Sequence, residues 1–195
     1  MQTDFVWLDL NLFGHERTTV VMLTKSFVDQ IWRHPVKSLG AEQISSLYLK
    51  KNETLPGDRV WALTYENSRF DMLNPRWAPS QVFLRCSIAP LFAAVSTKLN
   101  DLDGTIEFFH PDLPTICLNL DKESERTRFV EWVKPICPKN APQPINLCKV
   151  PGRGMTDTDY PSVSLNSTSS LDDLSIKMAM KLQPRRFRGN IWVKG

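Results

Sequence analysis

Basic side chains recur in short polar turns of this sequence, and such turns are suited to binding anions. The turns contain Lys37 with Ser38, Arg59, Arg153, and Arg188 with Asn190. Lysine supplies a point charge and arginine a planar fork that matches phosphate oxygens, while serine hydroxyls and turn N–H groups add further donors. A phosphate-bearing ligand is therefore one interpretation. The other is that exposed turns carry Lys, Arg and Ser for solubility.

Other kinds of chemistry find little support in the residue pattern. His15, His34 and His110 lie far apart, and none has a carboxylate or thiol at metal-ligand spacing, so each is expected to be structural or to face solvent. Ser164 is not in a GxSxG context, and no P-loop or GxGxxG motif occurs. The pattern gives no support to a hydrolase, a kinase or a dinucleotide-dependent enzyme.

The elements that must position these turns are expected to be mainly strands with a few helices, an α+β fold built around a β-rich barrel or sandwich. Residues 123–137 have helical spacing, and Pro135 should end that helix. Residues 169–182 predict a second helix, which begins at a capping box formed by Ser170 and Asp173. Short alternating or β-branched segments predict strands at 26–34, 42–50, 58–66, 92–99, 105–110, 115–120, 145–150, 162–165 and 190–195.

Composition limits the class of protein further. The chain has 195 residues with 24 Lys and Arg against 21 Asp and Glu, a net charge of +3 that is too small to indicate nucleic-acid binding. Four cysteines without a CxxC pair predict reduced, mostly buried thiols rather than a disulfide framework. No apolar run is long enough to span a bilayer, and no secretory pattern occurs. We expect a cytoplasmic protein that binds neither nucleic acid nor a membrane.

Four motifs, in order, resemble proteins of the MOSC family, named for the C-terminal domain of molybdenum cofactor sulfurase. They are HPVKSLGAEQ at 34–43, LPGDRVWAL at 55–63, PGRGMTDTDYPSVSL at 151–165 and SSLDDLSIKMAMKLQPRRFRGNIWV at 169–193. The resemblance to the amidoxime-reducing subgroup implies an N-terminal β-barrel-like domain over 25–150 and the incomplete first part of a MOSC β-barrel domain over 151–195. Residues 1–24 do not match and are treated as an uncertain N-terminal extension.

The resemblance also implies a cofactor and an activity. Proteins of this subgroup are oxidoreductases that reduce N-hydroxylated compounds at a molybdenum cofactor (molybdopterin), with electrons from an external reductase. Carried over position by position, the implied cofactor-binding residues are Lys37, Ser38, Arg59, Ser164, Arg188 and Asn190.

Three departures from the family pattern limit this expectation. Ser162 and Val163 stand where the relatives often carry Asp and a hydroxyl residue. The cysteine that binds molybdenum lies beyond the Arg-x-Asn in the family, and the four cysteines here precede Arg188 and are all expected in the core. We therefore predict no metal ligand and no catalytic residue in this chain, which is interpreted either as a fragment or as a remnant protein that no longer carries out the chemistry.

A further expectation concerns the last predicted strand. With the sheet interrupted after 190–195, Ile191, Trp192 and Val193 should lie on an exposed edge. The alternative function is a non-catalytic β-barrel module that binds a phosphorylated ligand or cofactor. A weaker alternative takes the basic stretch from Lys177 to Lys194, which follows Asp173 without another acid, as a surface for polyanions.

Overall fold

Short strands and two α-helices follow one another in the computed structural model, which describes residues 26–195. The predicted extension, residues 1–24, lies outside the described residues. The main elements are β1 (Phe27–Arg33), β2 (Glu42–Ile44), β3 (Trp61–Tyr65), β4 (Ser96–Leu99), β5 (Ile106–His110), β6 (Leu113–Leu118), α1 (Glu123–Val133), β7 (Pro144–Lys149), β8 (Leu165–Ser167), α2 (Thr168–Lys177) and β9 (Ile191–Lys194). This confirms the expected α+β class with mostly strands.

Four short 3-10 turns connect these elements: η1 (Ser80–Val82), η2 (Pro90–Ala94), η3 (Lys134–Ile136) and η4 (Pro184–Phe187). Within residues 26–195, neither helix is long and apolar enough to cross a bilayer. Two predicted strands are shorter than expected. The segment 42–50 forms a strand only over Glu42–Ile44, and 92–99 begins in the turn η2 before it becomes β4.

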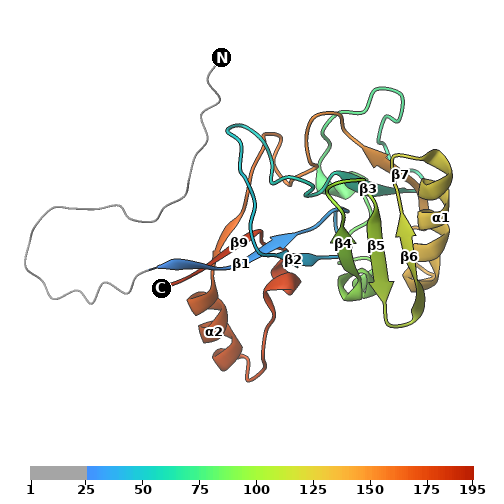
Figure 1. Cartoon of the computed structure of the whole chain (residues 1–195). Coiled ribbons are helices and arrows are strands. Elements are labelled where there is room, and N and C mark those ends of the chain that lie inside the picture. The colour runs from blue at the N-terminus through green and yellow to red at the C-terminus, as the bar shows by residue number, and fades with distance from the viewer. Residues whose placement is uncertain (1–25) are drawn as a thin grey trace, which may run out of the picture.

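The strands form three sheets, and none of these closes into a barrel in the part of the chain that is described. Their strand orders are β2-β1-β9-β8, β3-β7 and β4-β5-β6. Neighbouring strands are antiparallel except β8 and β9, which are parallel. Figure 1 shows α1 beside β6 and β7 on one side of the molecule, whereas α2 lies near β9 on the other.

The last strand lies inside the four-stranded sheet, and the expectation of an exposed edge at Ile191, Trp192 and Val193 is wrong. β9 is hydrogen-bonded to β1 on one side and to β8 on the other. The exposed fraction of the Trp192 side chain is only 3%. Strands from both predicted domains, 25–150 and 151–195, share this sheet, and the division into two domains stays a prediction.

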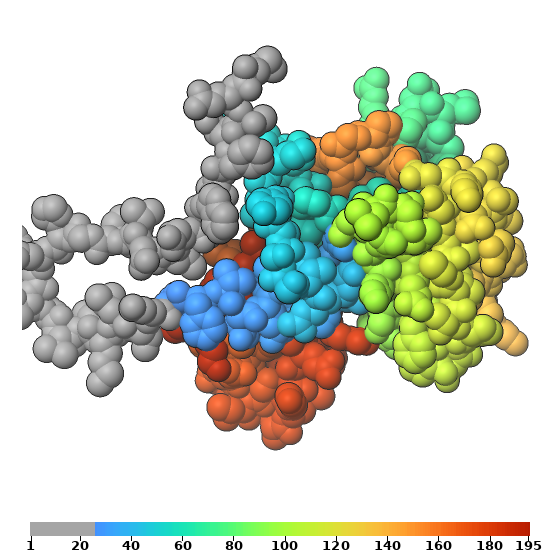
Figure 2. Space-filling view, viewed as in Figure 1, coloured from blue at the N-terminus to red at the C-terminus, as the bar shows by residue number. Residues whose placement is uncertain are grey.

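A small core holds α2 against this sheet. Leu171 of α2 packs with Leu182 and Trp192, and Trp32 of β1 is partly buried against them. Figure 2 shows the orange-red segment that contains α2 protruding from one end of the molecule, next to the blue surface of β1. The two ends of the described chain are therefore joined by backbone pairing and by apolar burial.

The helices lie where the sequence predicts them, although α2 begins one residue earlier and ends at Lys177, five residues before the predicted end at Leu182. α1 ends at Val133 because Pro135 has no N–H and cannot continue the helix, and the chain turns into η3. The capping box at Ser170 is wrong by one turn: Ser167 is the N-cap, and its hydroxyl accepts a hydrogen bond from the N–H of Ser170. β8 runs directly into this cap, so the strand predicted at 162–165 is shifted to Leu165–Ser167.

The largest core lies between α1 and the sheet β4-β5-β6. Along β5, Ile106 and Phe108 are buried while Glu107 and Phe109 are exposed, because side chains alternate between the two faces of a strand. The ring centroids of Phe108 on β5 and Phe129 on α1 are 4.6 Å apart, and the two rings form a tilted aromatic pair. The same core includes Trp61 and Leu63 of β3 and Leu147 of β7.

Phe108→Ala should lower the free energy of unfolding by about 3 to 5 kcal/mol, because it removes a fully buried ring and leaves a cavity between β5 and α1. Phe109→Ala is the matched control, since the neighbouring ring is 49% exposed. Urea unfolding followed by tryptophan fluorescence measures both variants. Equal losses in the two variants would contradict this assignment of the buried face.

Candidate functional site

Three basic side chains from distant parts of the chain converge in the structure. Lys37 lies in the turn after β1, Arg59 lies just before β3, and Arg188 lies between η4 and β9. Lys37 is 3% exposed and Arg59 9% exposed, whereas Arg188 is half-buried. Arg59 Nη2 donates to the carbonyl of Arg188 at 2.7 Å, so the two arginines are in direct contact. We call Lys37, Arg59 and Arg188 the cation cluster.

Arg188 also forms hydrogen bonds with the turn that follows β1. Arg188 Nη1 donates to the carbonyl of Gly40 at 3.1 Å, and Nη2 donates to the carbonyl of Val36 at 3.2 Å. The backbone N–H of Lys37 donates to the carbonyl of Trp61 at 2.6 Å, which ties the same turn to β3. Thus the turns of the cation cluster hold one another in place.

Several of these turns place a non-glycine residue in the left-handed backbone region. Ser38, Arg59 and Arg188 have φ values of 63°, 51° and 54°. Such conformations cost of the order of 1 kcal/mol each, and they gather at binding and catalytic sites more than elsewhere. Gly40 has a φ of 69°, and a Cβ atom there would lie 2.5 Å from Cγ2 of Thr97. The backbone of these turns therefore adopts conformations that place the side chains at the site, at a cost in conformational energy.

Asn190 and Ser164, also predicted from the motifs, lie at the same place and bind one another. Ser164 Oγ donates to Asn190 Oδ1 at 3.1 Å, and the backbone N–H of Asn190 donates to Ser164 Oγ at 2.8 Å. Asn190 Nδ2 donates to the carbonyl of Trp32 at 3.2 Å, and Arg59 Nη1 lies 3.4 Å from Asn190 Oδ1. Asn190 is buried and links β1, β9 and Arg59, whereas Ser164 is exposed.

Two carboxylates that sequence reasoning missed accompany the cation cluster. Asp58 is 1% exposed, forms a close ion pair with Arg59 and accepts the backbone N–H of His34 at 2.7 Å. Lys37 Nζ donates to Asp157 Oδ1 at 2.6 Å and to the carbonyl of Met155 at 2.9 Å. Asp58 directly precedes Arg59 in the Pro-Gly-Asp turn, which was the available signal, but nothing in the sequence links Asp157 to Lys37.

Arg153, the remaining basic turn residue, is not part of the cation cluster. Its guanidinium donates to the carbonyls of Thr158 and Asp159 and lies near the hydroxyl of Thr156. The side chain therefore closes the segment 151–161 on itself, and its role is to shape the loop that carries Asp157.

Burial and mutual repulsion act together on the charges of the cation cluster. Burial lowers the pKa of Lys37 below its usual 10.5; Asp157 opposes this change, while Arg59 and Arg188 add to it. Burial lowers the pKa of Arg188 to about 10, and Arg59 lowers it as well. With a pKa of about 10, Arg188 stays cationic at neutral pH. With Asp58 and Asp157 as counter-charges, the three cations keep an excess positive charge that a bound anion would neutralise.

His34 lies beneath the cation cluster and is fully buried. Its Nδ1 lies 3.2 Å from the carbonyl of Gly40, to which it donates in the neutral form, and Nε2 has no partner among the described residues. Burial, together with the charges of Arg188 and Arg59, lowers the pKa of His34 well below 6.5. His34 therefore adds no fourth positive charge to the site at neutral pH, and the expected structural role of this histidine fits its surroundings.

Ser38 contributes its carbonyl to a contact that the sequence did not predict. Cys86 Sγ donates to the Ser38 carbonyl at 2.6 Å, and Arg188 is close enough to influence the thiol. Burial raises the pKa of Cys86 above 9.0, and Arg188 only partly opposes this. The thiol is thus protonated at neutral pH, beside the cation cluster.

The cysteines only partly match the expectation of four core residues. All four are free thiols, as predicted, and Cys137 and Cys148 are buried. Cys86 is half-buried at the cation cluster and packs against the largest core, whereas Cys117 is exposed on β6, so the assignment to the core is wrong for Cys117. Cys117 is exposed because β6 turns this side chain to the solvent face of its sheet.

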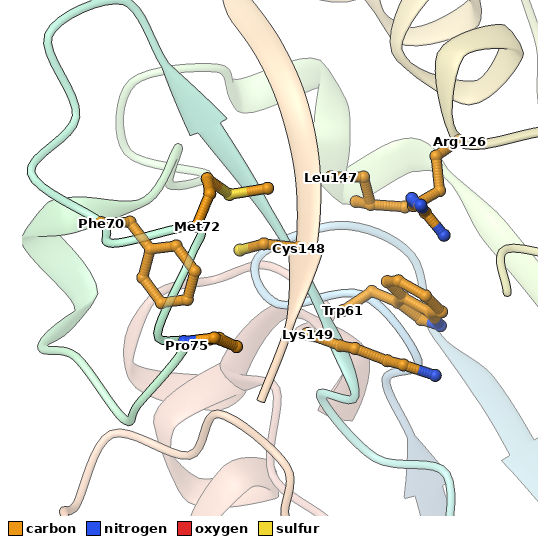
Figure 3. Close-up of a pocket in the computed structure, with 8 residues that line it drawn as sticks. All are labelled: Trp61, Phe70, Met72, Pro75, Arg126, Leu147, Cys148 and Lys149. Atoms are coloured by element: carbon orange, nitrogen blue, oxygen red, sulfur yellow. The ribbon is translucent and has the colours of Figure 1, made fainter. Parts of the chain in front are cut away.

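A separate pocket of about 180 Å³ lies along β7, away from these turns. In Figure 3, Phe70, Met72 and Pro75 line one side of it, and Cys148 points toward them. Lys149 Nζ lies 4.9 Å from the centroid of the Trp61 ring, a cation–π contact. Burial raises the pKa of Cys148 to about 12, so its thiol is inert.

Comparison with known proteins adds no relative to this description: no family model, no curated protein and no solved structure matches the chain. Within residues 26–195, no group of three or more His, Cys, Asp or Glu side chains could hold a metal ion.

The basic stretch from Lys177 to Lys194, the weaker alternative site, has ordinary local contacts. One of them is the ion pair of Lys177 with Asp173 at 2.8 Å, one helical turn away. We therefore take the cation cluster as the candidate functional site.

The pKa of His34 gives the folded protein a pH-dependent stability. Below about pH 6.5 the unfolded chain takes up a proton on this imidazole and the folded protein does not, so the free energy of unfolding falls as the pH decreases. His34→Asn keeps a donor for Gly40 and removes the titration. Between pH 6.5 and 5, its slope should be flatter than that of the wild type by up to about 1.4 kcal/mol per pH unit.

Urea unfolding at a series of pH values from 8 to 5 measures both slopes. Identical slopes would mean that His34 is protonated in the folded protein, which contradicts its placement beside Arg59 and Arg188.

Proposed function

We propose that the cation cluster binds the phosphate of a phosphorylated cofactor, and that this cofactor is the molybdenum cofactor. The convergence of Lys37, Arg59 and Arg188 from three distant turns is the observation that carries the proposal. Three buried or half-buried cations with an excess of positive charge are costly without an anion. These charges would suit any phosphate group. The resemblance of the four motifs to MOSC proteins is our reason for proposing the phosphate of a pterin.

The donors at the site fit a phosphate group. Arginine has five N–H donors, and the bonds formed by Arg188 within the described residues use only two of them. Lys37 Nζ has three donors, of which Met155 and Asp157 take two. The cluster therefore keeps donors for the oxygens of a ligand. The exposed Ser164 and the half-buried Ser38 lie beside it, where they would contact the polar edge of a pterin.

The chain's own residues would bind and orient the cofactor. Lys37, Arg59 and Arg188 would hold the phosphate, while Asn190 would keep Arg59 and Ser164 in place through their hydrogen bonds. In the proteins that the motifs resemble, the bound cofactor supplies a redox-active metal for the reduction of N-hydroxylated compounds, with electrons from a separate reductase; the molybdenum-ligand cysteine of those proteins has no counterpart among the four cysteines of this chain. The same proposal assigns residues 25–150 to the barrel-like N-terminal domain of the family and residues 151–195 to the opening part of its MOSC domain.

A non-catalytic module that binds a phosphorylated ligand is the second candidate. The state of Cys86 favours it, because the thiol nearest the cation cluster has a raised pKa and donates to the carbonyl of Ser38. A soft metal needs a thiolate rather than a thiol. In this version the phosphate contacts are the same, and the chain holds the ligand without turnover.

Lys37→Ala and Arg188→Ala should each reduce the pterin content of the purified protein by at least about tenfold, because each removes a charge-assisted contact to phosphate. The chain would be purified from a host that makes the molybdenum cofactor, and pterin and molybdenum would be measured per chain. Arg186→Ala is the control, since it removes an exposed charge two residues from Arg188. Thermal unfolding of each variant shows whether it is folded.

Each result has a distinct meaning. Pterin with molybdenum in the wild type, lost in both variants, supports the cofactor-binding proposal. Pterin without molybdenum supports the non-catalytic module. Full pterin content in folded Lys37→Ala and Arg188→Ala contradicts the assignment of the site.

A further inference from the structure

Asp157 is placed where an anionic ligand would meet the cation cluster. Its carboxylate lies 2.6 Å from Lys37 Nζ, yet its side chain is 76% exposed while that of Lys37 is 3% exposed. The carboxylate thus reaches the buried ammonium group from the solvent side. Both Arg59 and Arg188 also lower the pKa of Asp157, against the raising effect of its own burial, so it faces all three cations.

The other carboxylate of the site has no such freedom. Asp58 is 1% exposed, and its two oxygens are taken by Arg59 and by the backbone N–H of His34. It is a permanent part of the fold. Asp157 forms a single side-chain contact, with Lys37, among the described residues. Of the two carboxylates, only that of Asp157 can rotate away from its partner without bringing a buried side chain into solvent.

The loop on either side of Asp157 is fastened, so the side chain can move without the backbone. The N–H of Met155 donates to the carbonyl of Arg59 at 2.8 Å, and Trp77 Nε1 donates to the carbonyl of Thr156 at 2.9 Å. On the other side, Arg153 holds the carbonyl of Thr158 at 3.0 Å. Rotation of one exposed carboxylate is therefore enough to free Lys37.

We infer that Asp157 is a built-in counter-anion that an incoming phosphate displaces from Lys37. The inference rests on the proposed function of the cation cluster and adds a selectivity. With Asp157 turned away, Lys37, Arg59 and Arg188 face Asp58 alone and carry an excess of two positive charges. A dianionic phosphate monoester neutralises that excess. A monoanionic diester only replaces the charge that Asp157 already supplies, so it gains little.

Asp157→Asn should bind inorganic phosphate about tenfold more tightly than the wild type, because the ligand no longer competes with a fixed negative charge. Isothermal titration calorimetry at constant ionic strength and pH 8 measures the affinity. Asp159→Asn is the matched control, since it removes an exposed carboxylate from the same loop that has no contact with Lys37. Dimethyl phosphate and methyl phosphate serve as the monoanionic and dianionic probes.

The wild type should prefer methyl phosphate to dimethyl phosphate, and in Asp157→Asn the affinity for methyl phosphate should rise at least as much as that for dimethyl phosphate, because a dianion is repelled more strongly by the carboxylate that the substitution removes. Phosphate binding that is lost in Lys37→Ala but unchanged or weaker in Asp157→Asn would overturn the role of Asp157 and leave the proposed function standing. No phosphate binding by the wild type or by Asp157→Asn would overturn both. A gain of equal size in Asp159→Asn would reduce the effect to general surface charge and also overturn the inference.

Discussion

The repulsion among three buried or half-buried cations is the constraint on which the site depends. Lys37, Arg59 and Arg188 are drawn together by backbone carbonyls and by Asp58, although burial and their mutual repulsion lower the pKa values of Lys37 and Arg188. Proteins retain such arrangements where an anion or a counter-ion completes them. The neutral state of His34 fits the same constraint, since a further charge would be unfavourable there.

The fold makes this convergence possible by pairing its two ends. Because β9 is inserted between β1 and β8, the turn that carries Arg188 and Asn190 is brought to the turn that follows β1. The N–H of Trp32 donates to the carbonyl of Asn190 at 2.7 Å, which fixes the start of β9 against β1. The strained backbone at Ser38, Arg59 and Arg188 is then held by the surrounding pairing.

Local patterns predicted the local structure, whereas long-range pairing was beyond them. The strand predicted at 105–110 and the end of α1 before Pro135 follow from neighbouring residues, and both are confirmed. The interior position of β9 and the contact of Asp157 with Lys37 join residues far apart in the chain, so no local pattern shows them. The motifs did select the residues that converge, but their charge balance depends on Asp58 and Asp157, which lie within the motifs and were not predicted as site residues.

The central claim is that the cation cluster, rather than the basic surface in general, binds phosphate. Titration of the isotope-labelled protein with inorganic phosphate, followed by NMR of backbone amides and arginine side chains, tests it most directly. The account predicts saturable shifts confined to residues 36–40, 58–60, 155–158 and 188–190. Shifts that do not saturate, or that appear mainly along the exposed basic stretch of α2 and η4, would contradict it.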